Sequence, residues 1–426
     1  MNNKFLFLVL AICGLVMAAL IVRRGELLML AMPFMIYLLV GILQAPEEIT
    51  LLASRTIDRF SVFAGEPAEV QINIKNQGSG LANLYLEDPL FPSMTVHSGQ
   101  AGQRISLPAG EMTGLNYTFK AARGVYEWST VHANASDPFG LFELQCDIPA
   151  PARLLVRPMP MKLRHIRLRP RFTLHTPGPI PAHLAGSGTD FLGVREYRPG
   201  DPLHRLNWRL AARHPRKLFT REYEQEEIAD VGLILDTRRL INYERVDDEL
   251  LEYSVSAAAS LSEIVLKEGN RVGLLVFGQS MAPIFPGYGK KQYNRILYNL
   301  AQAALSPNLP LVYLEYFPAR LFPSRSIIVM LSTLGPRDLG TYARLRSFGY
   351  DVLLINPDPV EYAARKLPPT ELNSLAVRAA RVERIIQLKQ LMKLGVRVVD
   401  WQVDQPFGKV VREISGYLKL RGNSPG

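Results

Sequence analysis

The N-terminal part of the chain carries two long apolar runs separated by a short charged turn. Residues 5–22 are almost purely apolar, and residues 27–43 are apolar again. Each run has about the 17–25 residues that a helix needs to cross a bilayer. A signal peptide is the alternative for the first run, but no small-residue cleavage site is clear and a second apolar run follows at once. The pattern predicts two transmembrane helices, forming a hairpin, over residues 1–46.

Basic residues flanking this hairpin favour one membrane orientation. Arg23 and Arg24 lie in the turn, whereas the N-terminal amine, Lys4, Arg55 and Arg59 lie on the other side. Cytoplasmic flanks carry the excess of lysine and arginine, so this tally favours cytoplasmic termini. We therefore expect the soluble parts of a multi-pass membrane protein on the cytoplasmic side.

Short runs of alternating apolar and polar residues follow between residues 47 and 158. Clear examples are residues 70–74, 84–86, 117–119 and 154–156. Clusters of turn-forming residues separate them. Several short strands at this spacing predict a β-sandwich domain. Nothing in the sandwich identifies a ligand.

The hydrophobic pattern changes again after Glu227. Continuous runs rich in β-branched residues occur at 231–235, 272–277, 327–331, 352–355 and 396–399. Such runs are typical of strands buried on both faces of a parallel sheet. Helical patterns lie between and after them, at 250–265, 377–394 and 410–418. Alternating strands and helices predict a doubly wound α/β domain over residues 228–426.

Residues 159–227 connect these two domains and carry the unusual charge. Residues 159–184 are rich in proline and arginine and show little periodicity, which indicates a linker. The chain has a formal net charge of +10, yet residues 151–220 alone hold 14 lysines and arginines against three acidic residues. All of the positive excess therefore lies in residues 151–220. The candidate functional residues there are Gly186, Gly188, Arg195, Glu196, Tyr197, Gly200, Asp201, Arg205, Trp208, Arg213 and Glu222.

The two cysteines add little to this picture. Cys13 falls in an apolar run and Cys146 has no plausible disulfide mate. No disulfide framework and no zinc-binding spacing is present. We expect no cofactor and no structural metal.

The connecting stretch closely resembles the signature of the bacterial domain-of-unknown-function 58 family. The matching residues are Gly186-Ser187-Gly188-Thr189, the run 195–201, Arg205, Trp208, Ala212-Arg213 and Arg221-Glu222. Residues 123–126 and 137–142 also look like parts of the sandwich that usually accompanies the family. The resemblance implies a C-terminal domain similar to von Willebrand factor A domains. It also implies proximity to MoxR-type AAA+ ATPases, beside which family members are commonly encoded, and it carries over no catalytic activity.

The resemblance raises the question of a metal site. A von Willebrand A domain that binds Mg²⁺ uses Asp-x-Ser-x-Ser after its first strand, and such oxygen ligands suit a hard cation. Here Asp236 is followed by Arg238 and Leu240 at the serine positions. After the third strand, Ser332-Thr333 lacks the acidic residue. We therefore predict a degenerate site without a metal, in which Asp236 pairs with Arg238 or Arg239 or caps a loop.

Phosphate binding is a second possibility raised by the glycines. Gly186 and Gly188, with nearby arginines, could present backbone N–H groups to an anion. No Walker lysine follows, and the glycines do not lie between a clear strand and a helix. A flexible turn is the simpler interpretation.

Acid–base chemistry is a third possibility. Glu196, Asp201 and Glu222, together with His204, could act in a hydrolase or transferase on cell-envelope substrates. Each acid also has an arginine close in sequence, which indicates a charge-paired network. These arginines are Arg195, Arg205 and Arg221. We expect this network to dock the stretch on the α/β domain around Trp208, or to form a partner-binding surface.

The basic, aromatic-rich stretch also meets the crude electrostatic criterion for nucleic acid. No nucleic-acid motif accompanies it, and an acidic partner or anionic lipid headgroups suit it better.

We therefore predict a multi-domain protein of the bacterial inner membrane: a transmembrane helical hairpin, a β-sandwich and a von Willebrand factor A-like doubly wound sheet. Its expected function is that of a non-enzymatic adaptor or scaffold in cell-envelope assembly or complex maturation. The expected partner is a MoxR-type AAA+ ATPase, and the enzymatic alternative acts through Glu196, Asp201 and Glu222.

Overall fold

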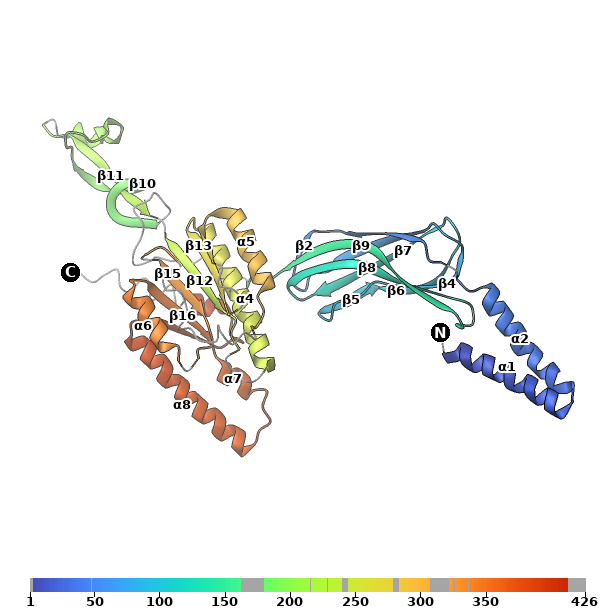
Figure 1. Ribbon diagram of the computed structural model, residues 1–426. Coiled ribbons are helices and arrows are strands. Elements are labelled where there is room, and N and C mark those ends of the chain that lie inside the picture. The colour runs from blue at the N-terminus through green and yellow to red at the C-terminus, as the bar shows by residue number, and fades with distance from the viewer. Residues whose placement is uncertain are drawn as a thin grey trace. The chain divides into compact units, whose positions relative to one another are not determined.

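The computed structural model describes residues 3–46, 48–161, 180–214, 216–227, 229–239, 244–278, 283–306, 322–324, 326–335 and 337–412. Its internal contacts divide the chain into two compact units, Met1–Arg157 and Pro158–Gly426. Figure 1 shows the helices and strands of both units.

The first unit begins with two antiparallel helices. Helix α1 spans Asn3–Val22 and helix α2 spans Glu26–Leu43. Arg23 lies in the turn between them with a positive φ of 53°. Both helices are long and apolar enough to cross a membrane, as judged by length and composition. Most of their large apolar side chains are exposed, such as Phe7 at 76%, which suits a lipid environment.

One loop of the following domain contacts both helices. The carboxylate of Asp137 is buried and accepts backbone hydrogen bonds from Phe139, Leu141 and Phe142. The ring of Phe142 lies 5.2 Å from that of Phe5 in α1, and the ring of Phe139 lies 4.0 Å from that of Tyr37 in α2. Asp137 thus fixes a turn whose aromatic side chains pack on the helices.

The rest of this unit is a sandwich of two sheets around one core. Its strands are β1 Leu51–Ile57, β2 Ser61–Phe63, β3 Ala68–Asn76, β4 Leu81–Glu87, β5 Met94–Gly99, β6 Gly102–Leu107, β7 Met112–Ala121, β8 Gly124–Ser136 and β9 Glu143–Arg157. They form sheets in the orders β1-β3-β7-β5 and β2-β9-β8-β4-β6. Burial alternates along β3 because successive side chains point to opposite faces of a sheet. Inward residues of both sheets form one apolar cluster, and the strands expected from the sequence are present.

A buried ion pair lies inside this sandwich. The side chains of Arg55 and Asp88 are both fully buried and paired. Arg55 also donates to the carbonyl oxygens of Ala150 and Thr130, and the hydroxyl of Tyr117 donates to Asp88 over 2.6 Å. Buried charges are tolerated only when paired and hydrogen-bonded in this way.

The second unit contains a mainly parallel sheet. Its strands are β12 Asp230–Asp236, β13 Arg271–Phe277, β14 Ile284–Gly287, β15 Ile327–Leu331, β16 Asp351–Pro357 and β17 Arg397–Trp401. The order is β14-β13-β12-β15-β16-β17, and only β14 pairs antiparallel among these described strands. The five continuous apolar runs of the sequence correspond to the five parallel strands.

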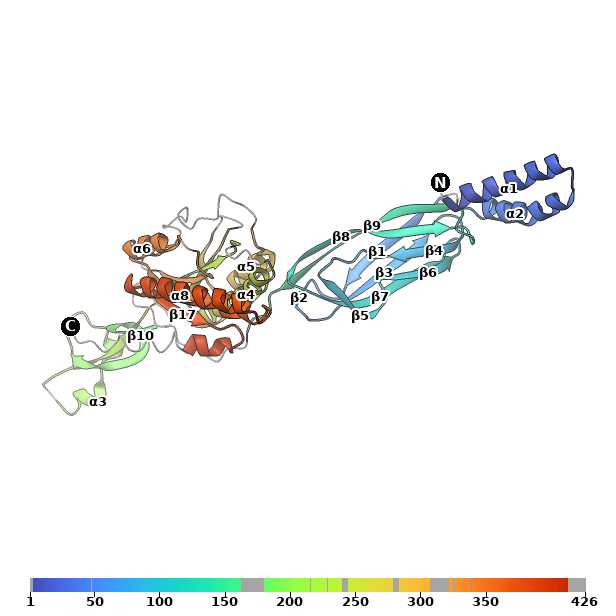
Figure 2. The ribbon, with the colours of Figure 1, turned by 90° about the horizontal axis from the view of Figure 1, so that it is seen from below.

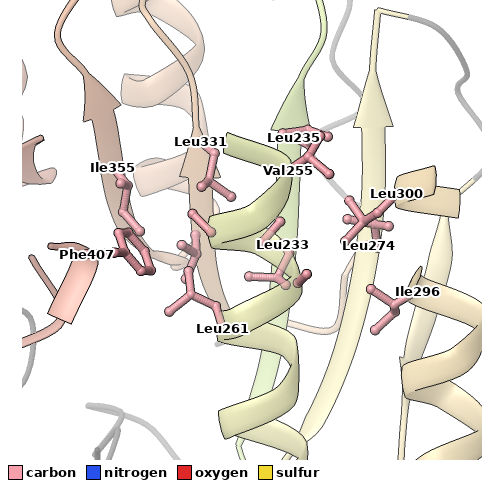
Figure 3. Packing of buried hydrophobic residues seen from close by; sticks show 14 of the residues in the cluster. Leu233, Leu235, Val255, Leu261, Leu274, Ile296, Leu300, Leu331, Ile355 and Phe407 are labelled. Atoms are coloured by element: carbon pink, nitrogen blue, oxygen red, sulfur yellow. The ribbon is translucent and has the colours of Figure 1, made fainter. Parts of the chain in front are cut away.

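Helices cover both faces of this sheet, as Figure 2 shows from a second direction. They are α4 Glu244–Lys267, α5 Gly289–Gln302, α6 Leu339–Ser347, α7 Pro359–Ala364 and α8 Glu371–Lys393. Leu233 and Leu235 of β12 pack with α4 and α5, as seen in Figure 3, whereas Ile234 packs with residues of α6 and α8 on the opposite face. The sheet is therefore buried on both sides, which explains why its strands lack an alternating pattern.

Two glycines make room for an aromatic ring in this sheet. Gly232 of β12 lies directly beside Gly273 of β13. A Cβ atom on Gly232 would lie 2.6 Å from the ring of Phe322, and one on Gly273 would lie 2.8 Å from it. Phe322 is buried against these strands, so side chains at either position would displace its ring.

A hairpin forms a separate two-stranded sheet in the second unit. Strand β10 spans Ile180–Glu196 and pairs antiparallel with β11, Phe219–Glu227. Gly186 and Gly188 lie within β10, where the register shifts between Gly186 and Phe191, so the predicted turn at these glycines is wrong. The predicted linker over 159–184 falls mostly on residues 162–179, outside the described residues, and its last residues belong to β10.

Candidate functional site

Residues 197–218, the hairpin tip, connect β10 to β11 through two short helical turns. These are a 3₁₀ helix at Leu203–Arg205 and helix α3 at Trp208–Ala211. The backbone N–H of Tyr197 donates to Leu218, and that of Asn207 donates to Phe219, each over 2.8 Å. The side chain of Asn207 caps α3 by accepting from the backbone N–H of Leu210 over 3.3 Å. The tip is therefore tied to both strands rather than joined only at its ends.

An ion-pair cluster centred on Arg195, the Arg195 cluster, stands at the base of the tip. The guanidinium of Arg195 donates two hydrogen bonds of 2.7 Å to the carboxylate of Asp201 and one of 2.7 Å to Glu222. Asp201 also accepts from the backbone N–H of Arg198 over 2.9 Å and from the hydroxyl of Thr220 over 3.3 Å. A bidentate arginine–carboxylate pair is geometrically specific, so this cluster fixes how the tip leaves the strands.

The predicted network exists, but its pairs differ from those expected from sequence neighbours. Asp201 and Glu222 both pair with Arg195, and Glu196 pairs with Lys217. Adjacent residues of a strand point to opposite faces, so the Arg195 guanidinium donates to the backbone carbonyl of Glu196, over 3.0 Å, and not to its carboxylate. The register places Arg195 opposite Thr220, two residues from Glu222 on the same face. Cross-strand position therefore selects the partners.

The Arg195 cluster is poorly suited to acid–base catalysis. Hydrogen bonds from the Arg195 guanidinium and from the backbone of Arg198 lower the pKa of Asp201 to about 2. A general acid or base works best with a pKa near the working pH. Asp201 is thus held as a carboxylate that orders the tip.

The apolar side chains of the tip are largely exposed. Leu203 is 68% exposed, Trp208 65% and Leu218 46%, whereas Leu206 is buried at 4%. The expectation that the stretch docks around Trp208 is therefore wrong, because Leu206 is the buried anchor and Trp208 faces outward. Leu206 forms an isolated bridge with Thr220, which places Trp208 two residues further along, on the α3 turn.

The segment that carries these exposed apolar groups is also rich in positive charge. Residues 193–222 carry eight arginines and lysines and three acidic residues, all three of which pair with Arg195 or Lys217. Six further arginines lie in the same segment: Arg198, Arg205, Arg209, Arg213, Arg216 and Arg221. All of these except the half-buried Arg205 are exposed. The tip combines an exposed indole with a strongly basic surface.

The other residues singled out from the sequence have local structural roles. Gly200 has a φ of 106°, which only glycine adopts easily, in the turn that presents Asp201. Tyr197 is half-buried at the end of β10. The sequence reasoning missed Leu203, Lys217 and Thr220. Only the register of the hairpin brings Lys217 and Thr220 to the carboxylates.

A second polar cluster lies at the carboxyl edge of the large sheet. After β12 the chain forms β13 and β14 on one side of β12, and it then forms β15 on the other side. A topological switch point therefore lies between β12 and β15. Ligands of open α/β sheets bind at such points. Here Arg238 occupies this position. Its guanidinium donates hydrogen bonds of 2.6 and 2.8 Å to the carboxylate of Asp236 and of 2.8 and 3.0 Å to that of Asp338. The side chains of all three residues are at most 4% exposed.

Further hydrogen bonds extend this cluster along the sheet edge. The hydroxyl of Ser332, after β15, donates to Asp236 over 2.6 Å, and Asn356 of β16 donates to the Ser332 carbonyl over 2.7 Å. Arg384 of α8 donates to both Asn356 and Asp400 of β17. We name this row the carboxyl-edge network. Asp236 pairs with Arg238, one of the two arginines named from the sequence, while Asp338 is a partner that the sequence did not reveal.

Comparisons with known proteins find one matching family model and relatives named as uncharacterized. A model of the family described as "Protein of unknown function DUF58" matches residues 193–374, from the hairpin to the start of α8. The chain is 26% identical over 278 residues to the uncharacterized protein YeaD of Bacillus subtilis, covering 64% of this chain and 67% of that protein. It is 25% identical over 127 residues to the uncharacterized protein Rv1480 of Mycobacterium tuberculosis. That match covers 29% of this chain and 39% of the relative.

Among the solved structures that resemble parts of the chain, two small domains illustrate the level of similarity. The CARDB domain of the PF1109 protein from Pyrococcus furiosus matches 26% of this chain at 17% identity, with a TM-score of 0.19. The cupredoxin domain of amoB from Nitrosocaldus yellowstonii matches 30% at 13% identity, with a TM-score of 0.20. Similarity at this level carries no functional argument.

Proposed function

We propose that this protein is a membrane-anchored adaptor that binds a protein partner through the hairpin tip. The observation that carries the proposal is that Trp208 and Leu203 are both exposed on a tip with a large excess of arginine. Tryptophan and arginine are the residues most enriched in binding hot spots. The acidic residues of the tip are occupied by internal ion pairs, so its net surface charge suits an acidic partner.

The carboxyl-edge network supports a metal-independent mode of binding. The switch-point position is filled by the guanidinium of Arg238, which already satisfies Asp236 and Asp338. We propose that the α/β domain, similar to von Willebrand A domains by the resemblance of its signature, acts as a rigid base for the hairpin. The proposed partner is a MoxR-type AAA+ ATPase, acting at the cytoplasmic face of the inner membrane in cell-envelope assembly or complex maturation.

Co-purification from detergent-solubilised membranes tests this function. The wild-type chain should retain an ATPase of this class, and Trp208→Ala should lose it without a change in melting temperature. Phe60→Ala is the matched control, because Phe60 is 93% exposed on the sandwich. Retention of the ATPase by the Trp208 variant would refute the assignment of the tip.

The same experiment separates the adaptor from an enzyme that uses the tip carboxylates. Asp201→Asn weakens the Arg195 cluster, so an adaptor should lose binding and tip order together. An enzyme that uses Asp201 in catalysis should lose turnover of a cell-envelope substrate out of proportion to any loss of tip order.

A further inference from the structure

Helix α8 packs on its own domain with one side and exposes the opposite side. Leu388 and Leu391 are buried, and Arg384 reaches the carboxyl-edge network. The exposed side carries a row of apolar residues: Leu372, Leu375, Ala379, Val382 and Ile386. Leu372 is 77% exposed, and the exposed fractions of Leu375, Val382 and Ile386 lie between 50% and 61%. We name this row the α8 seam.

The spacing of the α8 seam is that of a coiled coil. Its members follow one another at intervals of three, four, three and four residues, which are the a and d positions of a heptad. The row from Leu372 to Ile386 is about 21 Å long at a rise of about 1.5 Å per residue. A contiguous apolar row of this kind on an exposed helix marks an interaction surface. Knob-into-hole packing against another helix is what this period selects.

The charged residues beside the seam indicate which helix packs against it: α8 of a second copy of the chain. Arg378 takes a g position and Glu383 an e position of the same heptads, and both side chains are exposed. Neither makes an ion pair with another residue in the described part of the chain. In a parallel two-stranded coiled coil, g and e residues of opposite strands face each other. Arg378 would then meet Glu383 of the partner subunit, and the contact would occur twice by symmetry.

We propose that the α8 seam joins two copies of this chain as a short parallel coiled coil. An antiparallel pair would place Arg378 opposite the partner subunit's Arg378, and Glu383 opposite the partner subunit's Glu383. Like charges so placed are unfavourable, so the charge pattern selects the parallel pair. The next heptad positions, Lys389 and Lys393, are cationic and end the apolar row. Because the seam is short, we expect it to bury less than the roughly 800 Å² per partner of a standard interface and to form a reversible dimer.

Cysteine cross-linking of the full chain in detergent tests the pairing. The background carries Cys13→Ser and Cys146→Ser, which removes both native cysteines. Leu375→Cys should give a disulfide-linked dimer on mild oxidation, because equivalent d positions meet in a parallel pair. Ser374→Cys is the control, exposed and one residue off the seam. Mixed Leu375→Cys and Ile386→Cys chains should not cross-link to each other.

Charge exchange provides the second arm of the test. Arg378→Glu should weaken association roughly tenfold, since two attractive contacts become repulsive. Adding Glu383→Arg to the same chain should restore it. Equal cross-linking at positions 374 and 375, preferential linking of 375 to 386, or no rescue by the charge exchange would each overturn the proposal. A seam that instead covers lipid would give no cross-link at 375, while Leu375→Glu would reduce binding to anionic vesicles.

Discussion

The guanidinium of Arg238 is the internal cation of the carboxyl-edge network, and its removal should strongly destabilise the α/β domain. Arg238→Ala deletes four hydrogen bonds of 2.6–3.0 Å to Asp236 and Asp338. It removes the guanidinium that pairs with two carboxylates whose side chains are 2% and 4% exposed. Breaking a buried ion pair by removing one partner costs about 3–5 kcal/mol. Lys267→Ala is the control, since its exposed pair with Glu263 should contribute only about 0.3–0.5 kcal/mol.

The sign of the pH dependence gives an independent check on Arg238→Ala. Burial raises the pKa of Asp338 even with Arg238 present, and loss of the arginine should raise that pKa further. At pH values above the ordinary pKa of a carboxyl group, the folded state then binds more protons than the unfolded state. The free energy of unfolding therefore falls as pH rises. The variant should therefore be more stable at pH 5 than at pH 8. Mg²⁺ or Mn²⁺ should raise its melting temperature but not that of the wild type, because oxygen ligands suit these ions.

Fluorescence can report this domain within the full chain. Trp401 is 1% exposed in β17, and the other two tryptophans can be changed by Trp128→Phe and Trp208→Phe. Denaturant unfolding of this background, with and without Arg238→Ala, gives the difference in free energy. A loss below about 1 kcal/mol, equal at both pH values, would refute the assignment of Arg238 as the internal counter-ion.

Three further perturbations test other parts of the fold. Asp88→Ala leaves Arg55 buried without its partner and should cost the sandwich about 3–5 kcal/mol, measured by denaturant unfolding; a loss near zero would contradict the pairing. Gly232→Ala should cost about 1–3 kcal/mol by displacing a core ring, whereas Gly340→Ala on open space in α6 should be neutral or stabilising. Amide hydrogen exchange measures the order of the hairpin tip. That order should persist above pH 3.8 and decrease toward pH 2 as Asp201 becomes protonated. Asp201→Asn should abolish that pH dependence.

The large sheet was predictable because each of its parallel strands has a recognisable local sequence pattern. Each parallel strand is buried on both faces, so each appears in the sequence as a continuous apolar run such as 231–235. The sandwich was predictable for the opposite reason, since one face of each strand is solvated and β3 alternates in burial. The two apolar helices follow from length and composition alone.

Non-local partners were harder to predict. Asp338 lies 100 residues from Arg238, and no local pattern shows that the two side chains share one site. Only the hairpin register brings Thr220 to Asp201 of the Arg195 cluster and Lys217 to Glu196. The irregular pairing of β10 makes that register difficult to derive from the sequence. The charge-paired stretch was expected to dock around Trp208, yet Leu206 is the buried residue there and forms a bridge with Thr220.

The most direct measurement is photo-cross-linking in cells from the hairpin tip. A photoreactive residue at position 208 should cross-link the full chain to an AAA+ ATPase, and the yield should fall with increasing salt because arginines surround the position. The same residue at position 60, exposed on the sandwich, should give no such product. Equal cross-linking from both positions, or none to an ATPase from position 208, would contradict the account of the tip as the partner-binding surface.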